Sequence, residues 1–416
     1  MSQSLALGWD TRFIVPVSVG TSMSADRHSL TTRRPPLWLI FAITATGVMA
    51  NTMVGPSIPD ILDHFGRSDS DAGIFVAAGP APAILLAPVF GVLADRRGRR
   101  AVLLPSLVAF AVGGTIAMVA TSWWMLIVAR FVQGIGTASL IGLAVSLIAD
   151  NWEGPDRIRY ISWNSAVLTV GVAAFPPLGG LLASLGTWRW SFSLFPIGFA
   201  TALLVAWKLN IPVQTRNVPV RQQLLRASIA VREPRFKAAI AVGFVVFMMI
   251  FGLFLTVFPV MLLDKFELAA GGRGLVIGVP AVTSTIAALL LSRTRMRFGA
   301  RRLIGVGAVV LGAAYAMIGI ADTVVVVIIG SLVYGLAEGT LIPTLQEIVS
   351  SSADTDSRAA VVSVFTSVMR SGQTAGPLLA SLLITDLGPQ TLFLLGATML
   401  VGVGLAVMAT SVLDVA

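Results

Sequence analysis

The sequence predicts an all-α membrane protein with twelve transmembrane helices in two six-helix repeats. Apolar residues make up 56% of the 416 residues and charged residues only 12%, whereas a soluble domain carries about 25% charged residues. Twelve continuously apolar stretches of roughly 19 to 26 residues are each long enough to cross a bilayer as a helix. The landmarks of the first half also recur in the second at one fixed spacing.

Four landmarks share that spacing. Gly171 and Pro176 correspond to Gly372 and Pro377 (372 − 171 = 201; 377 − 176 = 201). The same interval relates the basic turn 96–100 to 297–301, Arg157 and Ser162 to Arg358 and Ser363, and Gly134 to Gly335. Because this spacing is constant and no insertion is needed to align the landmarks, it predicts two structurally equivalent halves. In a membrane protein, such halves form a site at their shared interface and rock around it.

The predicted spans are helices rather than barrel strands because they are continuously apolar and do not alternate. They cover residues 37–59, 72–94, 101–121, 123–148, 160–184, 190–209, 238–262, 273–292, 303–321, 324–347, 359–384 and 390–412. The predicted domains are a cytoplasmic tail at 1–36, a bundle at 37–209, a basic cytoplasmic linker at 210–237, a bundle at 238–412 and a tail at 413–416. Within the linker, 221–231 reads equally as an amphipathic helix on the membrane surface or as solvated chain. The true start is Met1 or Met23.

The formal net charge of +9 is a signal of topology. Arginine is concentrated in the second, fourth, eighth and tenth connections, whereas the opposite connections hold only Arg67, Arg189, Lys265 and Arg273. The positive-inside rule then places both termini in the cytoplasm of a multi-pass protein of the cell membrane. A nucleic-acid partner would need a basic soluble domain, and no part of the sequence reads as one.

Composition also argues against several kinds of chemistry. Cysteine is absent, and the two histidines, His28 and His64, lie outside the apolar segments. We therefore expect no metal site and no cofactor. Lysine occurs only at 208, 237 and 265, so there is no Gly-x-x-x-x-Gly-Lys loop for ATP. The expected partners are a small-molecule substrate, protons and the lipid bilayer, and we expect a monomer. A membrane enzyme or receptor is a remote alternative.

The loop between the second and third predicted spans carries a family resemblance. Its sequence GVLADRRGRR, at 91–100, resembles the G-x-L-A-D-R-x-G-R-R/K loop of the major facilitator superfamily. Glycine permits the tight turn, the aspartate can face the positive end of a helix, and the arginines hold the turn at the anionic inner leaflet. The resemblance implies a gating loop formed by Gly91, Asp95, Arg96, Gly98, Arg99 and Arg100.

Three further stretches resemble the twelve-helix drug:proton antiporter branch of that superfamily. RFVQGIG at 130–136 resembles R-x-x-Q-G-x-G, and WRWSF at 188–192 resembles W-R-W-x-F. GVAAFPPLGG at 171–180 resembles the antiporter motif G-x-x-x-G-P-x-x-G-G, but Phe175 replaces a glycine that the family keeps for close helix packing. The motif and its counterpart in the eleventh span comprise Gly171, Pro176, Gly179, Gly180, Gly372, Gly376 and Pro377.

The resemblance implies a secondary transporter, namely a proton-coupled exporter of small organic or drug-like molecules that works by alternating access. Uptake or facilitated movement of a small metabolite is the alternative that keeps the same fold. The direction of flux separates the two, and the sequence does not identify the substrate.

Three ionisable residues lie at membrane depth, where charge is costly and usually functional. They are Arg130, Glu338 and Arg370, the candidates for proton coupling. We expect Glu338 and Arg370 to pair, either as a static ion pair or with Glu338 exchanging the coupling proton. Many relatives carry a carboxylate in the first span, but here that span offers Asn51, with Asp60 at its outer end.

Neutral polar residues complete the predicted cleft. Gln133 follows Arg130 and Gln373 follows Arg370 by three positions, which places each pair on one helix face. We expect Asn51, Gln133 and Gln373 to line the substrate cleft. The alternative for Arg130 is that its side chain snorkels to the outer interface.

Overall fold

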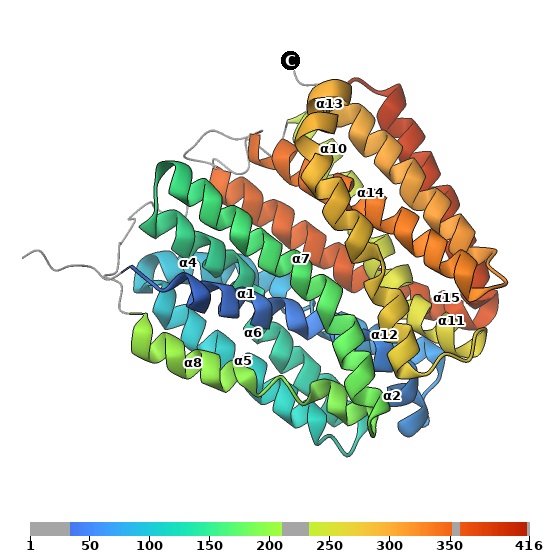
Figure 1. Cartoon of the computed structure of the whole chain (residues 1–416), viewed down its shortest axis with the longest axis horizontal. Helices are drawn as coiled ribbons and strands as arrows, with labels where there is room; N and C mark the ends of the chain where they lie inside the picture. The colour runs from blue at the N-terminus through green and yellow to red at the C-terminus, as the bar shows by residue number, and fades with distance from the viewer. Residues whose placement is uncertain (1–33, 210–232, 352–357, 414–416) are drawn as a thin grey trace, which may run out of the picture.

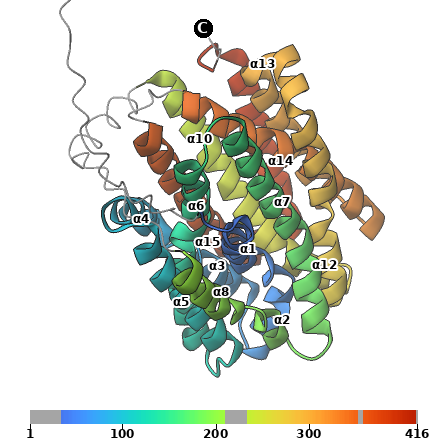
Figure 2. The ribbon, with the colours of Figure 1, turned by 60° about the vertical axis from the view of Figure 1, so that its left-hand side comes forward.

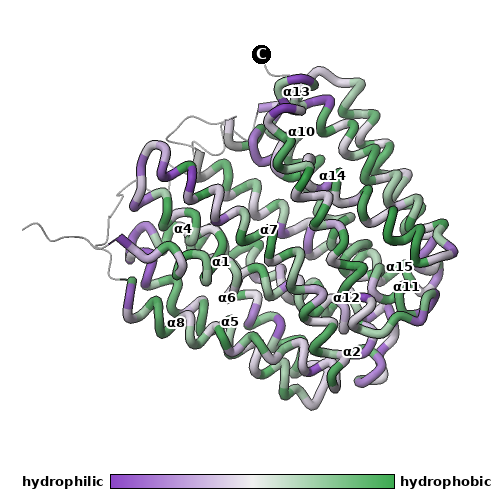
Figure 3. Tube along the Cα trace, in the orientation of Figure 1, coloured by the Kyte–Doolittle hydropathy of each residue, from purple (hydrophilic) through white to green (hydrophobic). Residues whose placement is uncertain are grey.

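The computed structural model describes residues 34–209, 233–351 and 358–413, and these ranges are helical apart from short connections (Figure 1). The described residues contain ten helical stretches, some made of several consecutive helices, that are long and apolar enough to cross a membrane. Hydrophobic residues run along their lengths, and hydrophilic residues gather toward their ends (Figure 3). Parts of three predictions lie outside the described residues: the tail up to residue 33, linker residues 210–232 with the possible helix at 221–231, and residues 414–416.

The first group of helices precedes the linker. It consists of α1 (Leu37–Thr52), η1 (Gly55–Ser57), α2 (Ile58–His64), η2 (Asp69–Asp71), α3 (Ala72–Ala78), α4 (Ala83–Arg97), α5 (Arg99–Met118), α6 (Trp123–Asn151), α7 (Gly154–Ser184), η3 (Trp188–Phe192) and α8 (Ile197–Lys208). The second group consists of α10 (Pro234–Met249), the π-helix η4 (Ile250–Val257), α11 (Phe258–Asp264), α12 (Ala270–Gly278), α13 (Pro280–Gly319), α14 (Val324–Ser351) and α15 (Arg358–Ala409). Each group forms a bundle (Figures 1 and 2).

Two helices are too long for one crossing, which needs about 20 residues. They are α13, with 40 residues, and α15, with 52. Each contains one glycine outside the helical conformation, Gly299 (φ 76°, ψ 162°) or Gly388 (φ 74°, ψ 160°). The predicted all-α membrane class is confirmed. The structure differs from the prediction of twelve separate helices at two places. After the eighth and after the eleventh predicted span the helix continues into the next span, and one glycine outside the helical conformation stands where a loop was predicted.

The interval of 201 residues recurs in the backbone. Gly98 has φ 87° and ψ 152°, close to the angles of Gly299 (299 − 98 = 201). Gly66 has φ 59°, and Glu267 has φ 51° (267 − 66 = 201). Left-handed conformation is uncommon for residues other than glycine. The conformation at this turn therefore recurs although its residue has changed.

The same interval recurs in helix packing. A Cβ on Gly134 would lie 2.0 Å from the carbonyl oxygen of Gly79, and one on Gly335 would lie 2.1 Å from that of Pro280. Both intervals are 201 (335 − 134; 280 − 79). Helices in membranes associate through small residues that let their backbones approach. Gly134 and Gly335 thus form equivalent contacts, one in each group.

The two groups meet backbone to backbone at one end of the molecule, which we call the closed end. A Cβ on Gly274 of α12 would lie 2.5 Å from the carbonyl oxygen of Pro176 on α7. A Cβ on Gly73 of α3 would lie 2.3 Å from that of Pro377 on α15. These contacts are again equivalent (274 − 73 = 201; 377 − 176 = 201). In Figure 1, α12 (yellow) lies beside α7 (green).

The opposite end, which holds the Gly98 and Gly299 turns, is called the motif end. Here α7 begins at Gly154, and residues 153–159 are all exposed. Six of these residues, 154–159, belong to α7 and cover every face of a helix with 3.6 residues per turn, so no described neighbour packs tightly on this part of α7. The groups therefore pack closely at the closed end and separate along α7 toward the motif end.

The contact at Gly134 yields a test within one helix. We expect Gly134→Val to lower the free energy of unfolding by about 3 kcal/mol, because the added side chain meets backbone rather than a flexible side chain. The control is Gly142→Val, also in α6, where a Cβ would meet nothing within 4 Å. Thermal melting of both detergent-solubilised variants checks this. Equal melting temperatures would contradict the close approach of α6 to the turn after α3.

Candidate functional site

Arg130 of α6 lies in the protein interior with only 4% of its surface exposed. Its Nη1 donates to the carbonyl oxygen of Ala50, 2.8 Å away, and to Oε1 of Gln133. Its guanidinium carbon lies 5.1 Å from the centre of the Phe75 ring. The side chain therefore faces other helices rather than the membrane interface, contrary to the snorkelling alternative.

A small pocket adjoins Arg130 where the two groups of helices meet. The first group contributes most of its lining, and the π-helix of the second group closes it. The lining residues are Asn51, Val54, Gly55, Ile58, Phe75, Val76, Arg130, Phe251 and Leu255. Of the predicted cleft residues, Asn51 lines this pocket and Gln133 reaches it only through Arg130. Neither Arg370 nor Gln373 lines it.

The π-helix η4 supplies the far wall of the pocket. The Thr256 hydroxyl donates to the carbonyl oxygen of Phe251, five residues earlier, at 2.7 Å. This wider turn re-aims side chains, and π-helical segments occur frequently at functional sites. Phe251 and Leu255 both belong to η4 and line the pocket. The sequence contains no signal for it, because the run 250–257 is almost uniformly apolar.

The predicted pair of Glu338 and Arg370 is not present. Arg370 Nη1 donates to Oε1 of Gln373 at 2.9 Å. Glu338 is half-buried on α14, and among the described residues it forms neither a hydrogen bond nor an ion pair. Its carboxylate lies within electrostatic range of the Tyr315 and Tyr334 hydroxyls. Similar depth in two helices does not make their side chains face each other, which is why the predicted pair fails.

A fully buried arginine joins the two groups at the closed end. Arg273 of α12 has no exposed surface. Its Nε donates to the carbonyl oxygen of Pro56 at 2.7 Å, its Nη1 to that of Leu268 at 3.0 Å, and its Nη2 to the carboxylate of Asp60. Because Asp60 and Pro56 belong to the first group and Arg273 to the second, we call this contact the clamp.

Sequence reasoning missed the clamp. It treated Arg273 as a loop arginine and Asp60 only as a carboxylate at the outer end of the first span. The partners are 213 residues apart, and no local pattern links them. The only available signal was that each lies at the end of an apolar segment predicted to reach the same membrane face.

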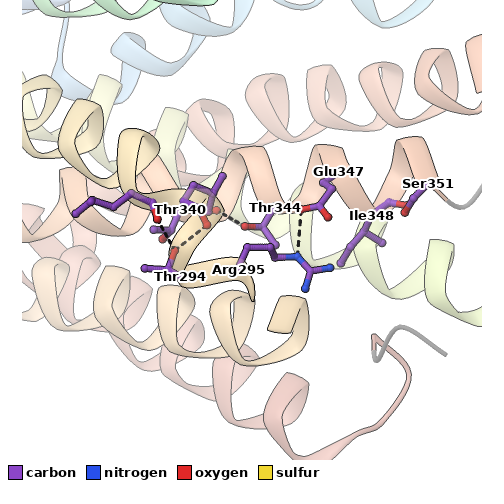
Figure 4. Close-up of polar contacts among 9 residues, drawn as sticks. Thr294, Arg295, Thr340, Thr344, Glu347, Ile348 and Ser351 are labelled. Carbon is purple, nitrogen blue, oxygen red and sulfur yellow. Dashed lines mark hydrogen bonds and ion pairs between the residues drawn. The ribbon is translucent and has the colours of Figure 1, made fainter. Parts of the chain in front are cut away.

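Residues of the loop at 91–100 form ion pairs within the first group. Arg99 Nη1 lies 2.7 Å from Oδ1 of Asp95, and Arg99 Nε lies 3.1 Å from Oδ2 of Asp150. The second group has a comparable link at the motif end, where Arg295 Nε of α13 reaches Oε2 of Glu347 on α14 at 3.1 Å (Figure 4). These ion pairs stabilise helix contacts within each group, and none of the three joins one group to the other.

The glycines of the antiporter-like motif on α7 and of its counterpart on α15 bring backbones together. A Cβ on Gly179 would lie 1.8 Å from the carbonyl oxygen of Met53, and one on Gly376 would lie 2.1 Å from that of Met248. Phe175, the departure from the antiporter pattern, packs over its own helix, since its ring lies 3.0 Å from a Cβ built on Gly171. The departure therefore does not prevent close packing around Gly179.

The clamp yields a test by chemical labelling. Ser57, beside the clamp, is fully buried, so Ser57→Cys in this cysteine-free chain reports opening of the closed end. Asp60→Asn leaves the Arg273 charge without its carboxylate, which weakens closure by about 1–3 kcal/mol. We expect thiol labelling to accelerate by about tenfold or more. The control is Asp63→Asn, the same change at an exposed residue. Equal labelling rates in both variants would show that the clamp does not hold the closed end.

Comparison with known proteins places this geometry in a family. The sequence profile described as Major Facilitator Superfamily matches residues 40–272 and 240–415. The class C tetracycline resistance protein of Escherichia coli is 38% identical over 136 residues, covering 32% of this chain and 34% of that protein. The MFS-type efflux pump MMF1 of Pseudozyma antarctica is 30% identical over 181 residues, covering 42% and 33%. The chain thus spans about a third of the length of these two relatives.

Solved structures share the fold over nearly the whole chain. The human organic anion transporter MFSD10 (TETRAN) has a TM-score of 0.69 at 19% identity, covering 89% of this chain and 98% of that one. A D-xylose-proton symporter has a TM-score of 0.72 at 16% identity, covering 89% and 96%. At such low sequence identities, the structural similarity is evidence for the fold alone. The chain belongs to the Major Facilitator Superfamily, a family of transporters and not of enzymes.

Proposed function

We propose that this transporter exports small organic molecules by proton-coupled alternating access. One observation carries the proposal: a pocket containing a buried charge lies between two helix groups that touch at one end and separate toward the other. The names of the sequence relatives, a tetracycline resistance protein and an efflux pump, support export as the direction. They match over part of their length, so export and the kind of substrate are proposals for this chain.

The proposed membrane arrangement has twelve crossings. Gly299 and Gly388, with their non-helical angles, divide α13 and α15 into two crossings each. The chain then forms six-helix bundles at 37–209 and 238–412, with both termini on the cytoplasmic side of the cell membrane. The motif end is cytoplasmic in this arrangement, in keeping with its arginines.

Transport follows from rocking of the two bundles about the pocket. In the state described, substrate enters from the motif end. Opening of the closed end requires release of Arg273 from Asp60 and separation of the Gly274–Pro176 and Gly73–Pro377 contacts. The ion pairs of Arg99 and Arg295 lie within their own bundles, so each bundle moves as a unit.

Glu338 is the proposed site of the coupling proton. It is half-buried, and no described residue pairs with its carboxylate, so its charge is not committed to a structural contact. A carboxylate in such a place gains or loses a proton as its surroundings change between two states. Arg130 and Arg370 are proposed to assist by placing positive charge in the interior.

The proposed function is tested in cells with and without the protein, using a panel of small aromatic and apolar compounds. Export predicts lower accumulation of at least one compound in cells with the protein, and an uncoupler that collapses the proton gradient restores accumulation. Higher accumulation in the presence of the protein would instead establish uptake. A difference that survives the uncoupler would contradict proton coupling.

Glu338→Gln tests the proton site. Because Glu338 has no ion pair to lose and an isolated charge at membrane depth is costly, we expect the melting temperature of Glu338→Gln not to fall below the wild-type value. Gradient-driven transport in proteoliposomes should fall to the protein-free rate, while exchange without net flux persists. The control is Glu347→Gln on the same helix. This change removes the carboxylate of the partly exposed Arg295–Glu347 ion pair, and such a pair stabilises the fold by about 0–1 kcal/mol. Gradient-driven transport by Glu338→Gln would eliminate Glu338 as the proton site.

A further inference from the structure

We propose that an apolar groove between α10 and α15 binds a phospholipid with an anionic headgroup. One acyl chain lies in the groove, and the phosphate lies against Arg235 and Lys237 at the motif end. The groove shares no lining residue with the pocket beside Arg130. Binding of this lipid is therefore independent of the proposed export function.

The groove has a volume of about 260 Å³. Val242 and Val407 are each only 7% exposed, whereas the neighbouring lining residues Ala241 and Ala406 are exposed. Thr410 is the only polar residue of the lining, and its hydroxyl donates to the carbonyl oxygen of Val407 at 3.4 Å. The groove thus presents apolar surface to whatever fills it.

The groove lies away from the other helix group. The part of α15 that lines it follows Gly388 and packs on α13, where a Cβ on Gly404 would lie 2.5 Å from the carbonyl oxygen of Gly305. No residue of the first group lines the groove. It therefore opens toward the lipid around the second group.

The repeat shows that small side chains create the groove. Ala241 corresponds to Ile40 (241 − 40 = 201), and Ala406 corresponds to Val205 (406 − 205 = 201). Ile40 and Val205 have no exposed surface and belong to one buried cluster. The first group thus fills this position with its own larger side chains. In the second group the space is left for an apolar ligand, since an empty void forfeits dispersion contacts.

The groove has the length and position of part of an acyl chain. Its lining on α10 extends from Ala238 to Val245, about 10 Å along the helix, whereas half of the hydrocarbon core is about 15 Å thick. Arg301, two residues after the Gly299 turn, donates to the carbonyl oxygen of Thr410 at 3.4 Å. This end of the groove therefore lies at the motif end, where lipid headgroups begin.

Positive charge lies at the same end. Lys237 precedes Ala241 by four residues, so it lies on the lining face of α10. Arg235 precedes Ala238 by three residues and lies on that face as well. Neither cation forms an ion pair with a described carboxylate. Each cation near a membrane surface favours an anionic headgroup by about fivefold, so the two together select an anionic lipid.

Native mass spectrometry of the detergent-solubilised full chain tests the site with two lipids that differ only in headgroup. Palmitoyl-oleoyl phosphatidylglycerol is anionic, and palmitoyl-oleoyl phosphatidylcholine is zwitterionic. The first phosphatidylglycerol molecule should bind about 10- to 30-fold more tightly, as two cations predict. Lys237→Gln should reduce this preference by about fivefold. The control Lys208→Gln, the same change at another exposed lysine, should keep it.

Ala241→Ile tests the groove itself, because it introduces the residue that the repeat has at this position. It should abolish tight binding of the first phosphatidylglycerol molecule, whereas Ala200→Ile, the same change at an exposed alanine of α8, should leave it intact. Equal affinity of the wild-type chain for the two lipids overturns the proposal, and that comparison needs no variant. A preference that survives Ala241→Ile overturns it as well, because the lipid then lies elsewhere.

Discussion

Backbone contact between the two helix groups is the constraint on which the rest of the structure depends. Inside a membrane, apolar side chains gain little by leaving lipid, so helices associate where small residues let their backbones approach. Gly274 meets Pro176, and Gly73 meets Pro377, at equivalent positions of the repeat. Both contacts lie at the closed end. The pocket beside Arg130 lies where the two groups meet, and the groups separate along α7 toward the motif end.

The clamp makes closure of this end depend on one ion pair. Arg273 is completely buried, whereas the Asp60 side chain keeps 39% of its surface exposed. Burial of the arginine makes closure depend on its carboxylate. The partial exposure of Asp60 leaves that carboxylate open to water, and the bond can be broken without a charge crossing the membrane interior. A reversible closure needs both properties.

Two sets of charged residues in the described helices differ in their partners. Arg99, Arg295 and Arg273 have carboxylate partners and hold helices together. Arg130, Glu338 and Arg370 lie within the bundle and pair with no carboxylate or cation among the described residues. Isolated charge at membrane depth is costly, and this cost supports the proposal that substrate and protons are the missing partners. This division links the fold to the proposed function.

Sequence reasoning reached the helices and the repeat because both leave periodic or continuous signals. The interval of 201 predicted equivalent turns, and Gly98 and Gly299 have matching angles. Spacing of three residues predicted that Arg130 and Gln133 share a face, and they are hydrogen-bonded. Contacts between helices far apart in the sequence could not be predicted, because the depth of a residue along a helix does not fix the direction of a side chain such as that of Glu338.

Alternating access requires the closed end to open during each transport cycle. A Cβ on Gly271 would lie 3.8 Å from that of Ser184, within the range of about 3.5–4.5 Å that suits a disulfide. The double variant Ser184→Cys with Gly271→Cys, in a chain that has no other cysteine, therefore locks α7 to α12 on oxidation. Substrate transport by the oxidised protein should cease and return after reduction, while each single variant transports under both conditions. Undiminished transport with the disulfide fully formed would contradict alternating access through this end.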